Sequence, residues 1–146
     1  MADYGVILMV QLARKPSQVT TAAGLAESTR LPVPTVSKLL KQLSRAELLE
    51  SRRGVNGGYA IIRPLNLITV ADIVSAVDGP IALTECISAE GAVCEIEALC
   101  PTRTNWKNIN DVLINALDDV SLADMAKPSL EPRLVKPKSV FADATA

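Results

Sequence analysis

Apolar residues recur at intervals of three and four along most of the chain, which is the spacing of an amphipathic helix. In the first 80 residues this spacing predicts helices at about 3–14, 22–26, 35–46 and 70–78. The expected apolar face of the first helix consists of Val6, Met9, Val10 and Ala13. Thr20 or Thr21 caps the second helix, Thr69 caps the fourth, and Gly79 with Pro80 ends it.

The third predicted helix has one apolar face and one polar, basic face. Its apolar positions are Val36, Leu39, Leu40 and Leu43. Its other faces carry Thr35, Ser37, Lys38, Lys41, Gln42 and Arg45. Pro32 and Pro34 suit the first turn of a helix but not its interior. A short helix, a tight turn and a second helix with a polar, basic outer face are typical of a helix-turn-helix.

Two short runs follow directly, at 48–53 and 58–63, and the residues between them are rich in glycine and asparagine. Such residues tolerate positive φ, so the pattern predicts a β-hairpin. Arg52 and Arg53 are expected at its tip, where they could contact phosphate or the minor groove. A basic hairpin next to a helix-turn-helix indicates a winged helix, and an ordinary surface hairpin is the alternative.

The helical pattern stops after residue 80 and returns near residue 104. Residues 81–102 have little periodicity and are expected to form a loop, whereas 104–118 predicts a long helix and Ser121 caps a last turn over 122–125. The apolar stripe of the long helix consists of Trp106, Ile109, Val112, Leu113, Ala116 and Leu117. This stripe fits either a plain core or a dimer interface, because small DNA-binding proteins often read two half-sites.

Charges are segregated along the chain, although the formal net charge of the 146 residues is only −1. Residues 29–63 hold seven basic and two acidic side chains, a net +5, whereas residues 67–125 hold two basic and ten acidic ones, a net −8. A basic front half suggests a face that binds a polyanion, and chance clustering is the alternative. The aromatic share of 3% leaves the core to aliphatic residues and favours helices.

Histidine is absent, which excludes Ser-His-Asp and Cys-His catalysis and every zinc site that needs imidazole from a single chain. No apolar run approaches 18 residues and no signal-peptide pattern opens the chain, so we expect a cytoplasmic protein with no membrane partner. In a reducing compartment, three cysteines argue against a disulfide framework and raise the question of metal or redox chemistry.

Cys86, Cys94 and Cys100 are separated by seven and five residues, unlike the close cysteine pair of a zinc knuckle. This spacing allows three thiolates to converge on a centre wider than one ion, such as an iron–sulfur cluster. Free buried cysteines are the common alternative. The loop is, however, rich in polar residues, so its thiols would be open to oxidation unless a metal protected them.

A series of motifs runs through the chain from residue 2 to residue 125. They are ADYG (2–5), PTVSKLLK (34–41), RGVNGGY (53–59), ITVADIV (68–74), DGPIALTEC (78–86), NW (105–106) and VSLADM (120–125). In this order they resemble the IscR/NsrR family of winged-helix iron–sulfur transcriptional regulators, and most of all its branch that regulates the SUF system of iron–sulfur cluster assembly. The resemblance implies a mainly α protein with a small β-hairpin wing, a long dimerisation helix and no enzyme activity.

The resemblance also implies a homodimer that binds a pseudo-palindromic promoter site in double-stranded DNA. It divides the chain into a DNA-binding domain (1–80), a cluster-binding loop (81–103), a dimerisation helix with its last turn (104–126) and a tail expected to be disordered (127–146). Residues expected at the DNA are Thr35, Ser37, Lys38, Lys41, Arg52, Arg53, Asn56 and Gly57. Residues expected at the dimer interface are Trp106, Ile109, Leu113 and Leu117.

By the same resemblance, Cys86, Cys94 and Cys100 hold a two-iron or four-iron cluster whose state biases DNA affinity. Some family members use a histidine three residues after the last cysteine as fourth ligand, but Arg103 stands there in this chain. Others use an aspartate early in the first helix, which matches Asp3; Asp3 equally fits an acid favoured at a helix N-terminus.

Glu47 stands where relatives often have glycine at the exit of the third helix.

Two other interpretations are compatible with the sequence. The first keeps the winged helix but treats the cysteines as a metal-free thiol redox switch. The second is a zinc-stabilised module whose basic half binds RNA or a protein.

Overall fold

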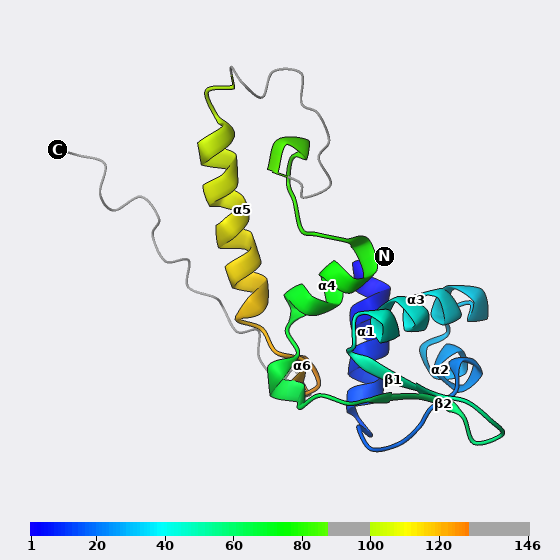
Figure 1. The fold of residues 1–146 in the computed structure, drawn as a ribbon. Coiled ribbons are helices and arrows are strands. Elements are labelled where there is room, and N and C mark those ends of the chain that lie inside the picture. Colours follow the sequence, from blue (N-terminus) through cyan, green and yellow to red (C-terminus); the bar gives the residue numbers. More distant parts are fainter. Residues whose placement is uncertain (88–99, 129–146) are drawn as a thin grey trace.

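The computed structural model describes residues 1–87 and 100–128. Its elements are α1 (Ala2–Ala13), α2 (Ala22–Thr29), α3 (Val33–Arg45), β1 (Leu49–Arg52), β2 (Gly58–Ile61), a 3-10 turn η1 (Leu65–Leu67), α4 (Val70–Asp78), a 3-10 turn η2 (Glu85–Ile87), α5 (Arg103–Asp118) and α6 (Leu122–Met125). The described part is mostly helical with one two-stranded antiparallel hairpin (Figure 1), which confirms the expected fold class. Most of the tail expected to be disordered, 129–146, lies outside the described residues.

The core lies between α1, α2, α3 and α4 and is built mainly from leucine, with few aromatic side chains. The apolar face predicted for α3 is confirmed, because Val36, Leu39, Leu40 and Leu43 are all fully buried. The face predicted for α1 was wrong in part. Met9 and Ala13 are buried, but Leu8 and Leu12 are buried beside them, and Val6 and Val10 are only partly covered. The reason is that α1 is central and contacts α2, α3, α4 and α6.

Helices α2 and α3 form the predicted helix-turn-helix. Thr21 caps α2, and its hydroxyl oxygen accepts a hydrogen bond from the Gly24 amide at 3.1 Å. Arg30 closes α2 in the left-handed region with φ 58° and turns the chain toward α3. Helix α3 begins at Val33, two residues before its predicted start. Pro34 fits in the first turn because amide groups there have no acceptor within the helix, so the amide hydrogen that proline lacks is not needed.

Glu47, at the exit of α3, has a backbone conformation that few residues other than glycine adopt readily. Its φ is 58°, in the left-handed region that favours glycine. The Glu47 amide donates to the Ser44 carbonyl, and the next amide, that of Leu48, donates to the Leu43 carbonyl, each at 3.1 Å. These bonds satisfy the last carbonyls of the helix and hold a non-glycine residue in a conformation that costs about 1 kcal/mol or more.

The predicted hairpin is present, with strands shorter than expected. Leu49 pairs with Ile61 at one end, and Arg52 pairs with Gly58 at the other. The turn has Gly54 at φ 106°, and a Cβ at Gly57 would collide with the Arg52 carbonyl oxygen, so both positions need glycine. A bridge between Thr20 and Tyr59, with two 2.9 Å backbone bonds, ties the hairpin to the loop before α2.

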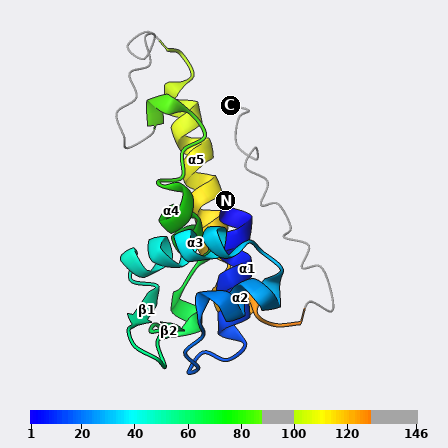
Figure 2. The ribbon, with the colours of Figure 1, turned by 90° about the vertical axis from the view of Figure 1, so that its right-hand side faces the viewer.

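Helix α5 stands out from the body, as the two perpendicular views show (Figures 1 and 2). Its C-terminal end is anchored where Thr69 pairs with Ser121, and the Leu122 amide donates to the Ile68 carbonyl at 2.7 Å. The predicted caps are confirmed here, because Thr69 forms a capping box with Asp72 and Ser121 caps α6. None of the helices in the described ranges has both the length and the apolar character that crossing a membrane requires.

Candidate nucleic-acid interface and cysteine site

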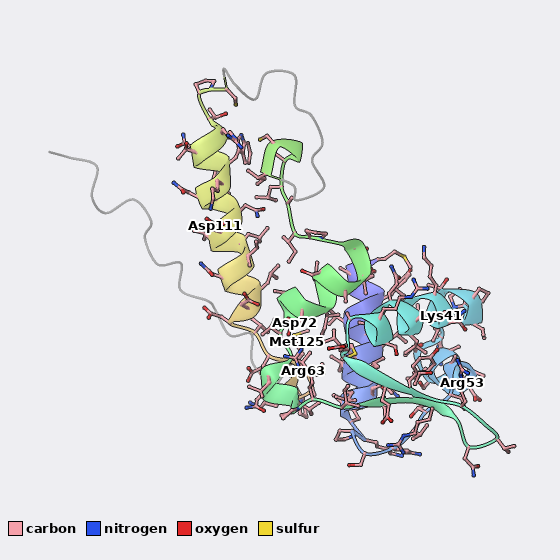
Figure 3. The ribbon with its side chains drawn as sticks, in the orientation of Figure 1. Lys41, Arg53, Arg63, Asp72, Asp111 and Met125 are labelled. Carbon is pink, nitrogen blue, oxygen red and sulfur yellow. The ribbon has the colours of Figure 1, made fainter. Side chains whose placement is uncertain are left out.

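Helix α3 presents a basic face to solvent on the side opposite its buried leucines. Lys38 and Lys41 are exposed, and Thr35 and Ser37 are partly exposed. Figure 3 places Lys41 and Arg53 on the side of the molecule away from α5, where Asp111 lies. Neither lysine forms an ion pair within residues 1–87 and 100–128. These two ammonium groups are therefore available for phosphate oxygens.

The wing separates its two arginines. Arg52 ends β1 instead of lying in the turn, and its guanidinium donates to Glu50 through Nε at 3.2 Å and Nη2 at 3.1 Å. Arg53 lies in the turn, is exposed, and makes no ion pair with the described part of the chain. Asn56, three residues later in the same turn, is exposed as well, whereas Gly57 is partly buried and packed against the backbone. The geometry thus gives Arg53 and Asn56 access to a partner, and Gly57 shapes the wing that presents them.

Two of the three cysteines lie close to the N-terminal end of α5. Cys86 is in η2, which packs on α5, and its Sγ is 3.3 Å from Thr84 Oγ1. Cys100 comes three residues before α5, and its Sγ is 3.4 Å from Thr102 Oγ1. This hydrogen bond with Thr102 is the main cause that lowers the pKa of the Cys100 thiol, and Arg103 adds to the effect. Cys94 lies outside the described residues.

A groove of about 800 Å³ adjoins the Cys86 thiol, between the end of α4, η2 and the first half of α5. Its lining includes Cys86, Arg103, Lys107, Asn110 and Asp111. Within residues 1–87 and 100–128, no three His, Cys, Asp or Glu side chains converge as a metal site. Two half-buried thiols, one with a lowered pKa, are nevertheless donors of the type that iron–sulfur clusters require. The donor chemistry therefore fits such a cluster.

Asp3 is not part of this group in a single chain. It lies in the first turn of α1, is exposed, and has a carboxylate oxygen 3.9 Å from the Met1 amino group. It does not join Cys86 and Cys100 in a cluster of possible ligands. A contribution of Asp3 from a second copy of the chain stays a prediction.

The long helix carries an apolar stripe that the described part of the chain does not cover. Trp106, Ile109 and Val112 are 38%, 48% and 51% exposed, whereas Leu113 and Leu117 are half-buried. Exposed large apolar side chains aligned on one helix are typical of an interface.

Sequence reasoning missed Asn110, which is buried at 6% exposure on α5. Its side chain bonds to the backbone at Ile81 and Leu83, just ahead of the cysteines. The available signal was its spacing of four from both Trp106 and Ile114, which places an uncharged polar residue next to apolar ones on the helix surface.

Comparison with known proteins gives a consistent result. The profile of the Rrf2 family, described as iron-dependent transcriptional regulators, matches residues 1–128. The HTH-type transcriptional regulator CymR of Bacillus subtilis is 30% identical over 124 residues, which is 84% of each chain. The HTH-type transcriptional regulator IscR of Xenorhabdus nematophila is 28% identical over 125 residues, which is 85% of this chain and 75% of that protein.

The fold agrees with these relatives. The solved structure of CymR, described as the global cysteine regulator of B. subtilis, superposes with a TM-score of 0.65 at 28% identity, over 86% of this chain and 92% of that one. These relatives are transcriptional regulators and not enzymes. Taken with the helix-turn-helix and the wing, the match over nearly the whole described chain shows that this protein belongs to the Rrf2 family of winged-helix, DNA-binding transcriptional regulators.

Proposed function

We propose that this regulator senses the state of an iron–sulfur cluster and controls genes of SUF-type iron–sulfur assembly. The observation that carries the proposal is the position of Cys86 and Cys100, which both lie near the N-terminal end of α5. Cys94 lies between them in the sequence, so one loop supplies three thiols. Similarity to IscR supports the same interpretation.

Three thiolates from one chain leave one position for a weaker ligand. Histidine is absent, and the guanidinium of Arg103 has no lone pair to donate. We assign this position to Asp3 of a second copy of the chain. When bound, a cluster supplies a centre that responds to iron, oxygen and redox state. The chain's own part is to hold the thiolates beside α5, where hydrogen bonds with Thr102 and the backbone of Arg103 lower the pKa of Cys100 and favour its ionised form.

For DNA recognition, we place α3 in the major groove and the wing tip at the adjacent backbone or minor groove. Thr35, Ser37 and Lys38 would face base edges, and Lys41 would contact phosphate. On the wing, Arg53 and Asn56 are the contact residues. Arg52 is already paired with Glu50 and contributes less.

The same proposal makes the protein a homodimer joined through α5, with Trp106 and Ile109 at the centre of the interface and Leu113 and Leu117 at its edge. Two copies related by a two-fold axis would read a pseudo-palindromic promoter site. In this arrangement residues 1–80 bind DNA, 81–103 hold the cluster and 104–126 set the distance between the two DNA-reading halves.

A metal-free thiol switch is the second candidate. It is favoured by the similarity to CymR, described as a global cysteine regulator, and by the lowered pKa of Cys100. A thiol that ionises easily is also one that oxidises easily.

Anaerobic purification followed by absorption spectra and by iron, sulfide and zinc analysis separates these functions. Cluster sensing predicts brown protein, and each of Cys86→Ala, Cys94→Ala and Cys100→Ala is expected to abolish the absorption after reconstitution with iron and sulfide. Asp3→Ala should weaken the cluster without preventing assembly. The matched control for the cysteine variants is Leu83→Ala, which changes an exposed residue of segment 81–103 and should retain the cluster. A full cluster band in any single Cys→Ala protein contradicts the three-cysteine site. Colourless, metal-free protein favours the thiol switch, and stoichiometric zinc favours a zinc site.

A further inference from the structure

The segment 77–83 connects α4 to the cysteine site and is held by side chains of two other helices. At its start, the Val77 carbonyl accepts a hydrogen bond of 3.0 Å from Gln42 Nε2 on α3. At its end, Asn110 Nδ2 on α5 donates to the Ile81 carbonyl at 2.9 Å, and Asn110 Oδ1 accepts from the Leu83 amide at 3.0 Å. One short stretch of backbone therefore links the DNA-reading helix to the long helix.

Asn110 is suited to positioning rather than to packing. It is 6% exposed and is the one buried polar side chain within the described ranges. Burying an amide without hydrogen-bond partners costs free energy. The amide of Asn110 instead forms one hydrogen bond as donor and one as acceptor, both with the backbone of segment 77–83. Together the two bonds fix both the distance and the rotation of residues 81–83 relative to α5. An aliphatic side chain at 110 would fill the space but hold nothing in register.

The position of these hydrogen bonds matters because segment 77–83 lies between the cysteine site and helix α3. Cys86 follows Leu83 by three residues and lines the same groove as Asn110. Gln42 follows Lys41 directly on α3, the helix with the exposed basic face. Between the two anchors the chain passes Gly79, with φ 87°, and Pro80, whose ring restricts the backbone. The cysteine site and Gln42 are therefore joined by one short, continuous and hydrogen-bonded stretch of backbone.

We propose that Asn110 is a positioning residue that couples the cysteine site to α3 through segment 77–83. The inference deepens the proposed function, because it assumes that the cysteine site is the regulatory site. Coupling between two sites is reciprocal. If the thiols influence DNA binding through this segment, then DNA binding must alter the environment of Cys86, and this effect must depend on Asn110.

The test measures the rate at which Cys86 in reduced, metal-free protein reacts with a methanethiosulfonate reagent, located by tandem mass spectrometry. The rate is compared with and without a DNA duplex that the wild-type protein has selected from a random pool. We expect DNA to change the wild-type rate by about fivefold or more. In Asn110→Ala the change should fall below about twofold. The matched control Asn108→Ala, an exposed asparagine on the same helix, should keep the wild-type ratio.

A second variant separates positioning from loss of folding. In Asn110→Asp the ionised carboxylate still accepts from Leu83 but cannot donate to Ile81, whereas the protonated acid can do both. The DNA-dependent ratio should therefore be small at about pH 8 and recover toward the wild-type ratio at about pH 5.5. The charged side chains that line the same groove are Arg103, Lys107 and Asp111, and they are the same in the variant and in wild type. The wild-type ratio measured at each pH therefore serves as the reference for any effect of these groups.

The outcomes decide between the alternatives. The coupling is overturned if DNA does not change the Cys86 reaction rate in wild type. It is also overturned if DNA changes this rate in Asn110→Ala as much as in wild type. An equally small ratio for Asn110→Asp at both pH values shows a packing role only and also overturns it. Failure of the proposed function looks different, because reconstitution then yields no cluster while the DNA-dependent reactivity of Cys86 persists.

Discussion

At the scale of single residues, the two described cysteines have different surroundings. Cys86 lies in η2 beside the groove, with Thr84 as its neighbour, whereas Cys100 contacts Thr102, the N-cap residue of α5. The Thr102 side chain is the first cause of the lowered pKa of Cys100, its backbone is the second, and the backbone and charge of Arg103 also contribute. The lowered pKa gives Cys100 a larger thiolate fraction at neutral pH than an ordinary cysteine thiol has.

Replacing Thr102 by valine should raise the pKa of Cys100 toward its ordinary value, because the hydrogen bond that stabilises the thiolate is lost. The measurement is the alkylation rate of Cys100 in metal-free protein as a function of pH, whose midpoint should move upward. The matched control is Thr104→Val, which changes an exposed threonine two residues later in α5 and should leave the midpoint unchanged. An unmoved midpoint in Thr102→Val would assign the pKa to another cause.

Glu47→Gly should stabilise the protein, because the left-handed φ of 58° strains a glutamate but not a glycine. We expect the free energy of unfolding to rise by about 0.5–1 kcal/mol, measured as a higher urea midpoint at unchanged slope and equal protein concentration. Glu47→Ala removes the same carboxylate and keeps the strain, so it should give no comparable gain. Equal effects of the two variants would show that charge, and not backbone conformation, is responsible.

At the scale of elements, the wing owes its form to glycine, and it presents to solvent one arginine that is unpaired within the described chain. Gly54 and Gly57 close a turn that a side chain would obstruct, and the turn displays Arg53 without an ion-pair partner in the described chain. Arg52 is only one residue away but is held along the strand by Glu50. Adjacent residues of one type thus have different capacities for contacting DNA.

Arg53→Ala should weaken binding to all DNA sequences and lower the salt dependence of the binding constant by about one unit, because one phosphate contact releases about one counterion. Arg52→Ala, the matched variant, should change the slope less, because its guanidinium is shared with Glu50. Binding measured across a series of salt concentrations gives both slopes. An unchanged slope for Arg53→Ala would remove the wing from the interface.

At the scale of the whole molecule, the exposed basic side chains of α3 and the wing lie apart from the long helix α5 (Figure 3), whereas Arg63 and Asp72 meet in the body at 3.9 Å. Lys41 and Arg53 lie on one side, and Asp111 lies on α5 on the other (Figure 3). Helix α5 extends beyond the body with Trp106, Ile109 and Val112 uncovered by the described chain. Burial of this stripe against a second copy would keep the basic faces of both subunits accessible.

Ile109→Asp should prevent dimer formation, because it would place an unpaired carboxylate in the apolar interface at a cost of several kcal/mol. Analytical ultracentrifugation should show a monomer, or a dimer only at much higher concentration. Asn108→Asp adds the same charge one residue earlier, beside the stripe, and should leave the dimer intact. If Ile109→Asp sediments like wild type, α5 is not the interface.

Local features were readable from the sequence because they depend on neighbours in the chain. The apolar face of α3 follows from residues three and four apart, the caps at Thr69 and Ser121 follow from one side chain and a nearby amide, and the glycines of the wing follow from backbone conformation. The weak periodicity of 81–102 predicted a loop that holds the three cysteines, and most of that stretch, Cys94 included, lies outside the described residues.

Only the tertiary structure decided features that join residues far apart in the sequence. The burial of Leu8 and Leu12 depends on the helices that surround α1, and the exposure of Ile109 depends on which face of α5 meets the body. Asn110 bonds to a segment 27 to 29 residues away, and Gln42 bonds to Val77 across 35 residues. No local periodicity encodes such contacts, because the packing of whole elements determines which backbone groups each side chain can reach.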